Sequence, residues 1–168
     1  MAIGRNEFLT ALRQWASGVT VVTTKDAAGT LHGITVSAFS SVSLAPPLVL
    51  ICIEKHAGSH HAFAESRRFV VNILSEAQQH ISQQFAAHLP DKFADIEFEE
   101  TADGIPILTG ALANLECRLV SSHESGDHTI FVGEIESTIV RTGEPLVYFE
   151  GQYRKIAEDD EHINADLR

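Results

Sequence analysis

The chain has 168 residues, of which 44% are apolar and 21% charged, a balance typical of one globular domain. Its formal net charge of -11 argues against nucleic acid or an anionic membrane surface as a partner, because binding to either depends on clustered Lys and Arg. The apolar run at residues 48–53 is much shorter than the roughly 20 residues of a membrane-spanning helix. The polar N-terminus lacks the apolar segment of a secretory signal, so we expect a cytoplasmic protein.

In chain order, the first elements expected are a helix and a β-hairpin. Asn6 would cap a helix that runs to Ala16 and stops before Gly18. The β-branched residues at 19–24 predict a strand, and residues 31–39 predict its returning partner. Pro46 and Pro47 then end a loop, because proline cannot donate to a strand ladder.

The later elements alternate between short helices and strands. They are expected as strands at residues 48–53, 69–73, 113–119, 129–140 and 152–156, helices at 59–66 and 75–88, and a loop at 90–106. Because the strands mostly follow one another without crossover helices, an antiparallel barrel with peripheral helices fits better than a doubly wound parallel sheet. The sequence also lacks the GxGxxG motif of a Rossmann dinucleotide site.

The cysteines and histidines form no recognisable ligand pattern. Cys52 and Cys117 are the only cysteines, and each lies in an apolar run, so both are expected to be reduced and to pack as small hydrophobic residues. No CxxC or HExxH spacing is present among them or the nine histidines. We therefore expect no metal site.

Hydroxyl side chains crowd residues 35–43, in the order Thr35, Ser37, Ser40, Ser41 and Ser43. Such a run suits a ligand that presents carbonyls, ring nitrogens, hydroxyls and a phosphate, since each of these groups needs a short-range donor or acceptor. The alternative is a strand whose serines face water before a turn. Composition alone favours that alternative.

Two further segments are candidate sites. At Asp127 and His128 a catalytic triad is not expected, because neighbouring side chains on an extended segment point to opposite faces and no GxSxG motif supplies a serine. His128 is instead expected to donate a hydrogen bond to a substrate. The strand end at Cys52 leads through Lys55 to Ser59, which would bind an anion, cap the next helix, or do both.

Taken in order, these segments resemble the flavin reductase-like family, the small reductase components of two-component flavin monooxygenases. The resemblance runs from Phe8 to Ile156. It rests on matches at residues 8–24, 33–49, 69–74, 115–117, 126–134, 145–149 and 151–153. It implies a mainly β fold, a split antiparallel (Greek-key) β-barrel of the FMN-binding type with a few peripheral helices, in a homodimer. Residues 1–157 would form the domain, and residues 158–168 an acidic C-terminal tail.

The implied activity is the NAD(P)H-dependent reduction of FMN or FAD, with the reduced flavin passed to a partner oxygenase. Hydride transfer between two cofactors depends on positioning, so no catalytic acid or base is strongly expected. By resemblance, the flavin would contact Thr35, Val36, Ser37, Ala38, Ser41, Cys52, Ile53, Glu54, Lys55, Ser59 and Phe85. The nicotinamide nucleotide would contact His128, Phe149, Gly151 and Tyr153. Many members have Asn where this chain has Ser37, which leaves its hydrogen bonds to the ring open.

Three alternatives remain at this point. The first is a reductase with tightly bound FMN that acts on another acceptor, such as ferric iron or a corrinoid. The second is a flavin-binding protein without enzymatic activity. The third is an interaction domain without a ligand, in which residues 35–43 would be a solvated strand end.

Overall fold

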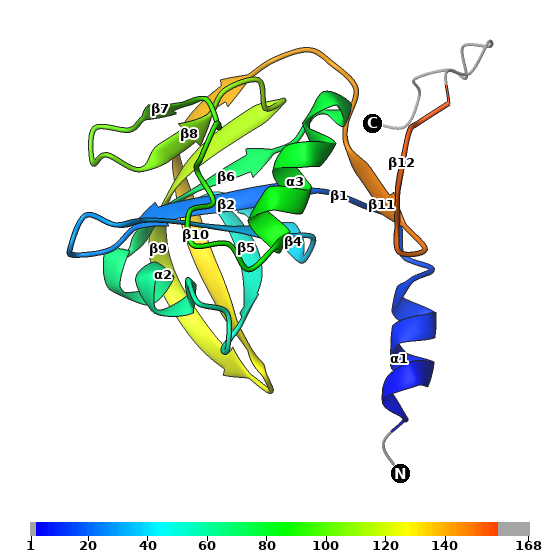
Figure 1. The fold of residues 1–168 in the computed structure, drawn as a ribbon. Coiled ribbons are helices and arrows are strands. Elements are labelled where there is room, and N and C mark those ends of the chain that lie inside the picture. Colours follow the sequence, from blue (N-terminus) through cyan, green and yellow to red (C-terminus); the bar gives the residue numbers. More distant parts are fainter. Residues whose placement is uncertain (1–2, 158–168) are drawn as a thin grey trace.

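The computed structural model describes residues 3–157 of the chain, so the expected acidic tail at 158–168 lies outside the described residues. Its main element is a seven-stranded antiparallel sheet with the order β3-β2-β6-β9-β10-β5-β4 (Figure 1). The strands are β2 (Thr20–Lys25), β3 (Leu31–Val36), β4 (Phe39–Leu44), β5 (Pro47–Glu54), β6 (Arg68–Ile73), β9 (Ala113–Ser125) and β10 (His128–Val140). This architecture confirms the expected antiparallel, mainly β fold.

The sheet curls into a barrel whose two edge strands are consecutive in the chain. β3 and β4 lie at opposite ends of the strand order, yet only Ser37 and Ala38 separate them. The Cys52 N–H donates to the Ala38 carbonyl at 3.0 Å, which holds this link beside β5. The expectation of one strand over residues 31–39 was therefore wrong, because the chain bends at 37–38 and passes from one sheet edge to the other.

The interior of the barrel is filled by side chains from alternate strand positions. Its largest fully buried members include Phe63, Phe69 and Phe131. Phe63 comes from α2 (His60–Ser66), which closes one end of the barrel and packs on β2 and β6. This core fixes the position of β5, whose inward side chains Val49, Ile51 and Ile53 are buried while the alternate ones face outward.

A second apolar cluster joins the outside of the barrel to α3 (Gln79–Ala86). The short helix η1 (Glu76–Gln78) precedes α3, and Ser75 and Gln78 form a capping box at its start. Phe85 of α3 is fully buried against Gly33 of β3. Because the Phe85 ring occupies the space that a Cβ at residue 33 would take, glycine is needed there for close packing.

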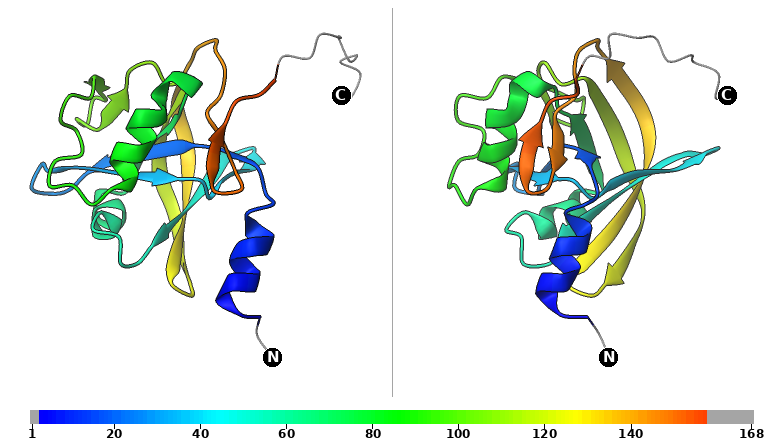
Figure 2. Two further views of the ribbon diagram at one scale, coloured as in Figure 1. Left: turned by 45° about the vertical axis from the view of Figure 1, so that its right-hand side comes forward. Right: turned by 90° about the vertical axis from the view of Figure 1, so that its right-hand side faces the viewer.

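The N- and C-terminal parts lie together beside the barrel. β1 (Ser17–Gly18), β11 (Val147–Phe149) and β12 (Gln152–Arg154) form a three-stranded sheet, and α1 (Arg5–Leu12) stands off the body with no buried residue (Figure 2). The predicted helix is present, but it begins after Gly4 and ends at Leu12, so the bounds predicted for it, Asn6 and Ala16, were wrong. The Arg13 carbonyl accepts the Glu150 N–H at 3.1 Å, so it is used by the C-terminal segment.

Two smaller differences concern the loop expected at residues 90–106 and the strand expected near residue 113. β7 (Phe98–Glu100) and β8 (Pro106–Leu108) form a short hairpin that the weak periodicity of the segment did not indicate. β9 continues to Ser125, where it pairs directly with the start of β10. Within residues 3–157, no helix is long and apolar enough to cross a membrane.

Candidate active site

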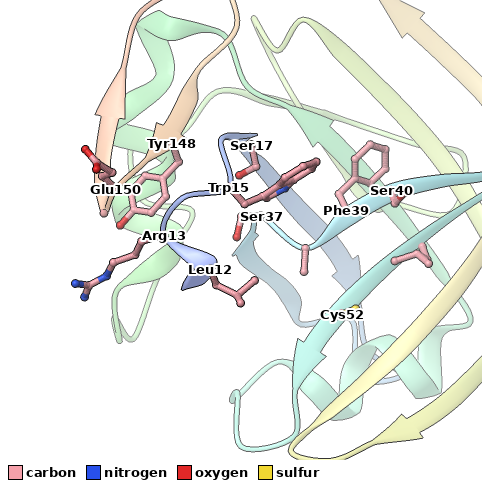
Figure 3. A pocket seen from close by; sticks show the side chains of 13 residues that line it. Leu12, Arg13, Trp15, Ser17, Ser37, Phe39, Ser40, Cys52, Tyr148 and Glu150 are labelled. Carbon is pink, nitrogen blue, oxygen red and sulfur yellow. The ribbon is translucent and has the colours of Figure 1, made fainter. Parts of the chain in front are cut away.

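A first hollow of about 460 Å³ lies where the end of α1 meets the β3–β4 bend and β5. Figure 3 shows the side chains that line it. They are Leu12, Arg13, Trp15, Ser17, Ser37, Ala38, Phe39, Ser40, Leu50, Cys52, Tyr148, Glu150 and Gly151. Most of this lining is apolar, and Trp15 is 74% exposed although its ring is large and apolar. An exposed aromatic ring beside an apolar hollow is typical of a surface that a planar ligand covers.

The β3–β4 bend supplies polar groups to this hollow. Ser37 and Ala38 are exposed, and neither takes part in the β2–β3 or the β4–β5 ladder. Their backbone N–H groups therefore lie outside the strand pairing and can donate to a ligand. Phe39 N–H closes the bend by donating to the Ser37 carbonyl at 3.0 Å.

A second hollow of about 1010 Å³ lies between β3, the segment before α2 and residues 86–93 after α3. Its polar lining includes Thr35, Glu54, His56, Ser59 and Lys92. The Lys92 ammonium group donates to the Phe85 carbonyl at 2.8 Å, and partial burial lowers the pKa of this side chain. An ammonium group has three donors, so Lys92 can also bind an anionic ligand group.

The two hollows lie along the outward face of β5. Leu50 and Cys52 line the first hollow, and Glu54 lines the second. Residues two apart on a strand share a face, and each residue advances the chain by about 3.4 Å, so these three positions span about 14 Å. An elongated ligand with a planar head and a polar tail matches that arrangement.

The structure distributes the predicted flavin contacts between these hollows and the core. Ser37, Ala38 and Cys52 line the first hollow, whereas Thr35, Glu54 and Ser59 line the second. Three other predicted contacts have buried side chains, namely Val36, Ile53 and Phe85. Ser41 is exposed on β4, and Lys55 forms an ion pair with Glu124.

Two hydroxyl groups differ from the simplest expectation. The Thr35 hydroxyl donates to the Ser82 carbonyl at 2.6 Å, so toward a ligand it can only accept. Ser59 occupies the position before α2, but its side chain makes no capping hydrogen bond. Of the two roles considered for Ser59, the structure therefore does not contain the side-chain cap.

The geometry expected for Asp127 and His128 was wrong. His128 Nδ1 lies 2.7 Å from Asp127 Oδ1, although the two residues are adjacent. Gly126 and Asp127 form the turn between β9 and β10 rather than an extended segment, so the Asp127 side chain can reach back to the ring. The same hydrogen bond lowers the pKa of Asp127.

The other residues predicted for the nicotinamide nucleotide come from the C-terminal segment. Gly151 lines the first hollow, and the Tyr153 hydroxyl is 2.8 Å from Ser82 Oγ. Phe149 ends β11 and is half-buried. His128 is the strand partner of Glu54, which lines the second hollow. Gly151 therefore lines the first hollow, whereas His128 is not among the residues that line either hollow.

Sequence reasoning missed several of the residues that line the two hollows. Trp15 and Tyr148 come from opposite ends of the chain, and only the contact between these ends shows that both face the first hollow. Lys92 and Phe93 lie in the segment expected to be a loop. The adjacent Lys92 and Phe93, in an otherwise largely polar segment, were the one local signal that could have indicated a site there.

Known proteins are similar to this chain in both sequence and fold. A family model described as a flavin reductase like domain matches residues 12–157. The chain is 42% identical over 168 residues to the reductase subunit HsaB of a flavin-dependent monooxygenase from Rhodococcus jostii (strain RHA1), covering 99% of this chain and 85% of that protein. It is 39% identical over 150 residues to the FMN reductase (NADH) SmoA of Agrobacterium fabrum, covering 89% of this chain and 85% of that one.

A solved structure agrees with these matches. The NADH:FAD oxidoreductase SgcE6 of Streptomyces globisporus, in complex with NAD and FAD fragments, superposes with a TM-score of 0.88 at 34% identity, covering 94% of this chain and 95% of that chain. The split-barrel fold implied by the resemblance is thereby confirmed. The chain belongs to the family of proteins built on the flavin reductase like domain.

Proposed function

We propose that this protein is an NAD(P)H-dependent flavin reductase that transfers a hydride from reduced nicotinamide to FMN or FAD. The observation that carries the proposal is the pair of hollows along the outward face of β5, one mainly apolar and one with polar lining. Membership of the family and the activities of SmoA and SgcE6 support the same function. The cofactors supply the redox chemistry, and the protein positions them.

The residues present fit a flavin. The first hollow offers an aromatic ring at Trp15 and backbone N–H groups at Ser37 and Ala38, which suit the isoalloxazine ring and its polar edge. The second hollow offers the Ser59 hydroxyl and the Lys92 ammonium group for a phosphate. Positioned donors near the ring also stabilise the negative charge that develops as the ring is reduced.

His128 would bind the nicotinamide nucleotide. Asp127 engages Nδ1 of the ring, which fixes the orientation of the imidazole and leaves Nε2 for a ligand. Gly151, beside the first hollow, lets the nucleotide approach the backbone closely. These residues would orient the nicotinamide nucleotide, and the hydride step itself needs no acid or base from the protein.

A homodimer is part of the proposal. Phe8, Leu9 and Leu12 of α1 are exposed, and Leu44 at the tip of β4 is 92% exposed. In the right-hand view of Figure 2, the β4–β5 hairpin projects away from the barrel. Apolar side chains on two projecting elements are typical of a surface that a second copy covers.

The physiological role would be to supply reduced flavin to an oxygenase in the cytoplasm. The support is that HsaB is the reductase subunit of a flavin-dependent monooxygenase and that a similar protein from Rhodococcus opacus is a reductase component of a nitrophenol monooxygenase.

The activity is tested by following NADH and NADPH oxidation with added FMN or FAD, alongside the flavin content of the purified protein. Rapid turnover that depends on added flavin is the expected result. Turnover of ferric iron or a corrinoid by protein that is already yellow would favour a bound-flavin reductase instead. Flavin binding without NAD(P)H oxidation would overturn the enzymatic assignment.

A further inference from the structure

Asp26, His32 and His61 converge at a place that the flavin and nicotinamide assignments do not use. We propose that these three side chains bind a divalent transition-metal ion, for which Zn²⁺ is the best match. They come from the turn after β2, from β3 and from α2, so only the fold brings them together. Sequence spacing alone gave no reason to expect a metal here.

The ligand atoms are already close to a binding geometry. One ligand atom from each of the three residues lies within 4.8 Å of the others, and Asp26 Oδ2 is 2.9 Å from His32 Nε2. The rings of His32 and His61 meet edge to face with centroids 5.3 Å apart. Tetrahedral zinc with bonds of about 2.1 Å needs ligand atoms about 3.4 Å apart. His61 is exposed, so its ring is free to move by the remaining distance.

Two of the ligands are held in place by their surroundings. Asp26 Oδ1 accepts the backbone N–H groups of Ala28 at 2.9 Å and Thr30 at 2.8 Å. This leaves Oδ2 directed at His32, whose position is fixed by pairing with Thr24 in the β2–β3 ladder. The Asp26 and His32 side chains are only 14% and 17% exposed. Outer hydrogen bonds of this kind orient ligating carboxylates in metal sites.

The donor set selects the metal. Two imidazoles and one carboxylate suit Zn²⁺ and similar transition metals, whereas Mg²⁺ and Ca²⁺ prefer oxygen ligands alone. Three protein ligands leave a fourth position for water or an anion. A simple Asp26–His32 hydrogen bond accounts for two of the residues. It does not account for the placement of His61, whose ring packs edge to face on that of His32.

The location gives the ion a structural consequence. His32 borders the second hollow, and Ser59 on the same hollow directly precedes α2, which carries His61. A bound ion would connect α2 to the β2–β3 hairpin. It would therefore brace two walls of the hollow without taking part in hydride transfer.

The test is calorimetric titration of tag-free, chelator-treated protein with ZnCl₂ in the absence of flavin. We expect one Zn²⁺ per chain, with a Kd below about 100 μM. The Kd of His61→Ala should be at least tenfold higher. His80→Ala removes another exposed histidine, on α3, and should bind as the wild type does. His61→Gln provides a second variant if His61→Ala is poorly folded.

Two results would overturn the proposal. One is wild-type protein that fails to bind Zn²⁺ at this concentration. The other is folded His61→Ala or His61→Gln that binds as tightly as the wild type. Because flavin is absent from the titration, the outcome is independent of whether the protein reduces flavin.

Discussion

Replacing Gly33 with alanine tests how β3 and α3 are packed beneath the second hollow. A Cβ at residue 33 would overlap the edge of the Phe85 ring, which is fully buried and cannot move into solvent. Overpacking of this kind costs about 1–3 kcal/mol. For a domain of this size, that corresponds to a fall in Tm of about 2–12 °C. The thermal unfolding of Gly33→Ala, followed by circular dichroism, measures the effect directly.

The same change should weaken flavin binding. Phe85 stacks edge to face on Phe93 with centroids 5.0 Å apart, and Phe93 lines the second hollow. A displaced Phe85 therefore shifts a wall of that hollow, and the Kd for flavin, measured by fluorescence quenching, should rise. Gly18→Ala is the matched control, since a Cβ there meets nothing within 4 Å.

A double mutant decides whether the Phe85 ring is the cause. Phe85→Leu should cost less stability in the Gly33→Ala background than in the wild type, by about 0.5 kcal/mol or more, because it removes the overlapping ring edge. Additive effects, or a Tm for Gly33→Ala equal to that of Gly18→Ala, would refute the packing argument.

Three further predictions concern the site, the dimer and the thiols. His128→Ala should raise the KM for NADH by up to about tenfold through loss of one hydrogen bond, and equal losses for NADH and flavin in steady-state kinetics would contradict that role. Leu44→Asp should weaken a dimer by about two to three orders of magnitude, visible by light scattering, because two buried leucines are lost by symmetry. Burial raises the pKa of Cys117 to about 12 and raises that of Cys52, so both thiols stay protonated at pH 8. Iodoacetamide, followed by mass spectrometry, should then label half-exposed Cys52 slowly, faster as the pH rises and slower with flavin bound, and should spare Cys117 until unfolding.

The elements that sequence alone predicted well are those whose local pattern agrees with their burial. The β-branched runs became β2 and β6, and the apolar run before Glu54 became β5. The helix expected from residue 75 begins there, with a capping box at Ser75. In each case the local preference and the tertiary environment favour the same structure, so no contact with a distant segment was needed to decide it.

The features that were predicted wrongly or not at all share a different cause. Each of them is determined by a contact with a residue far away in the sequence or by a turn. α1 ends early where the Arg13 carbonyl accepts the N–H of Glu150. The Asp127–His128 hydrogen bond exists because the pair straddles the end of a turn rather than lying within a strand. The first hollow is lined by residues from both ends of the chain, and the local sequence of neither end indicates that the two ends are in contact.

The bend at Ser37 and Ala38 places the candidate ligand site at the seam of the barrel, the position where its two edge strands, β3 and β4, meet without a hydrogen-bond ladder. Around the rest of the circumference, neighbouring strands share a ladder of hydrogen bonds, but the edge strands β3 and β4 are joined through two residues, Ser37 and Ala38. Amide protons at this seam should exchange with solvent faster than those of β2 or β6. A flavin that accepts hydrogen bonds from Ser37 and Ala38 would take the place of the missing ladder. Flavin binding would then make the whole barrel more rigid. Release of the flavin would make the barrel more flexible again, which favours departure of the product.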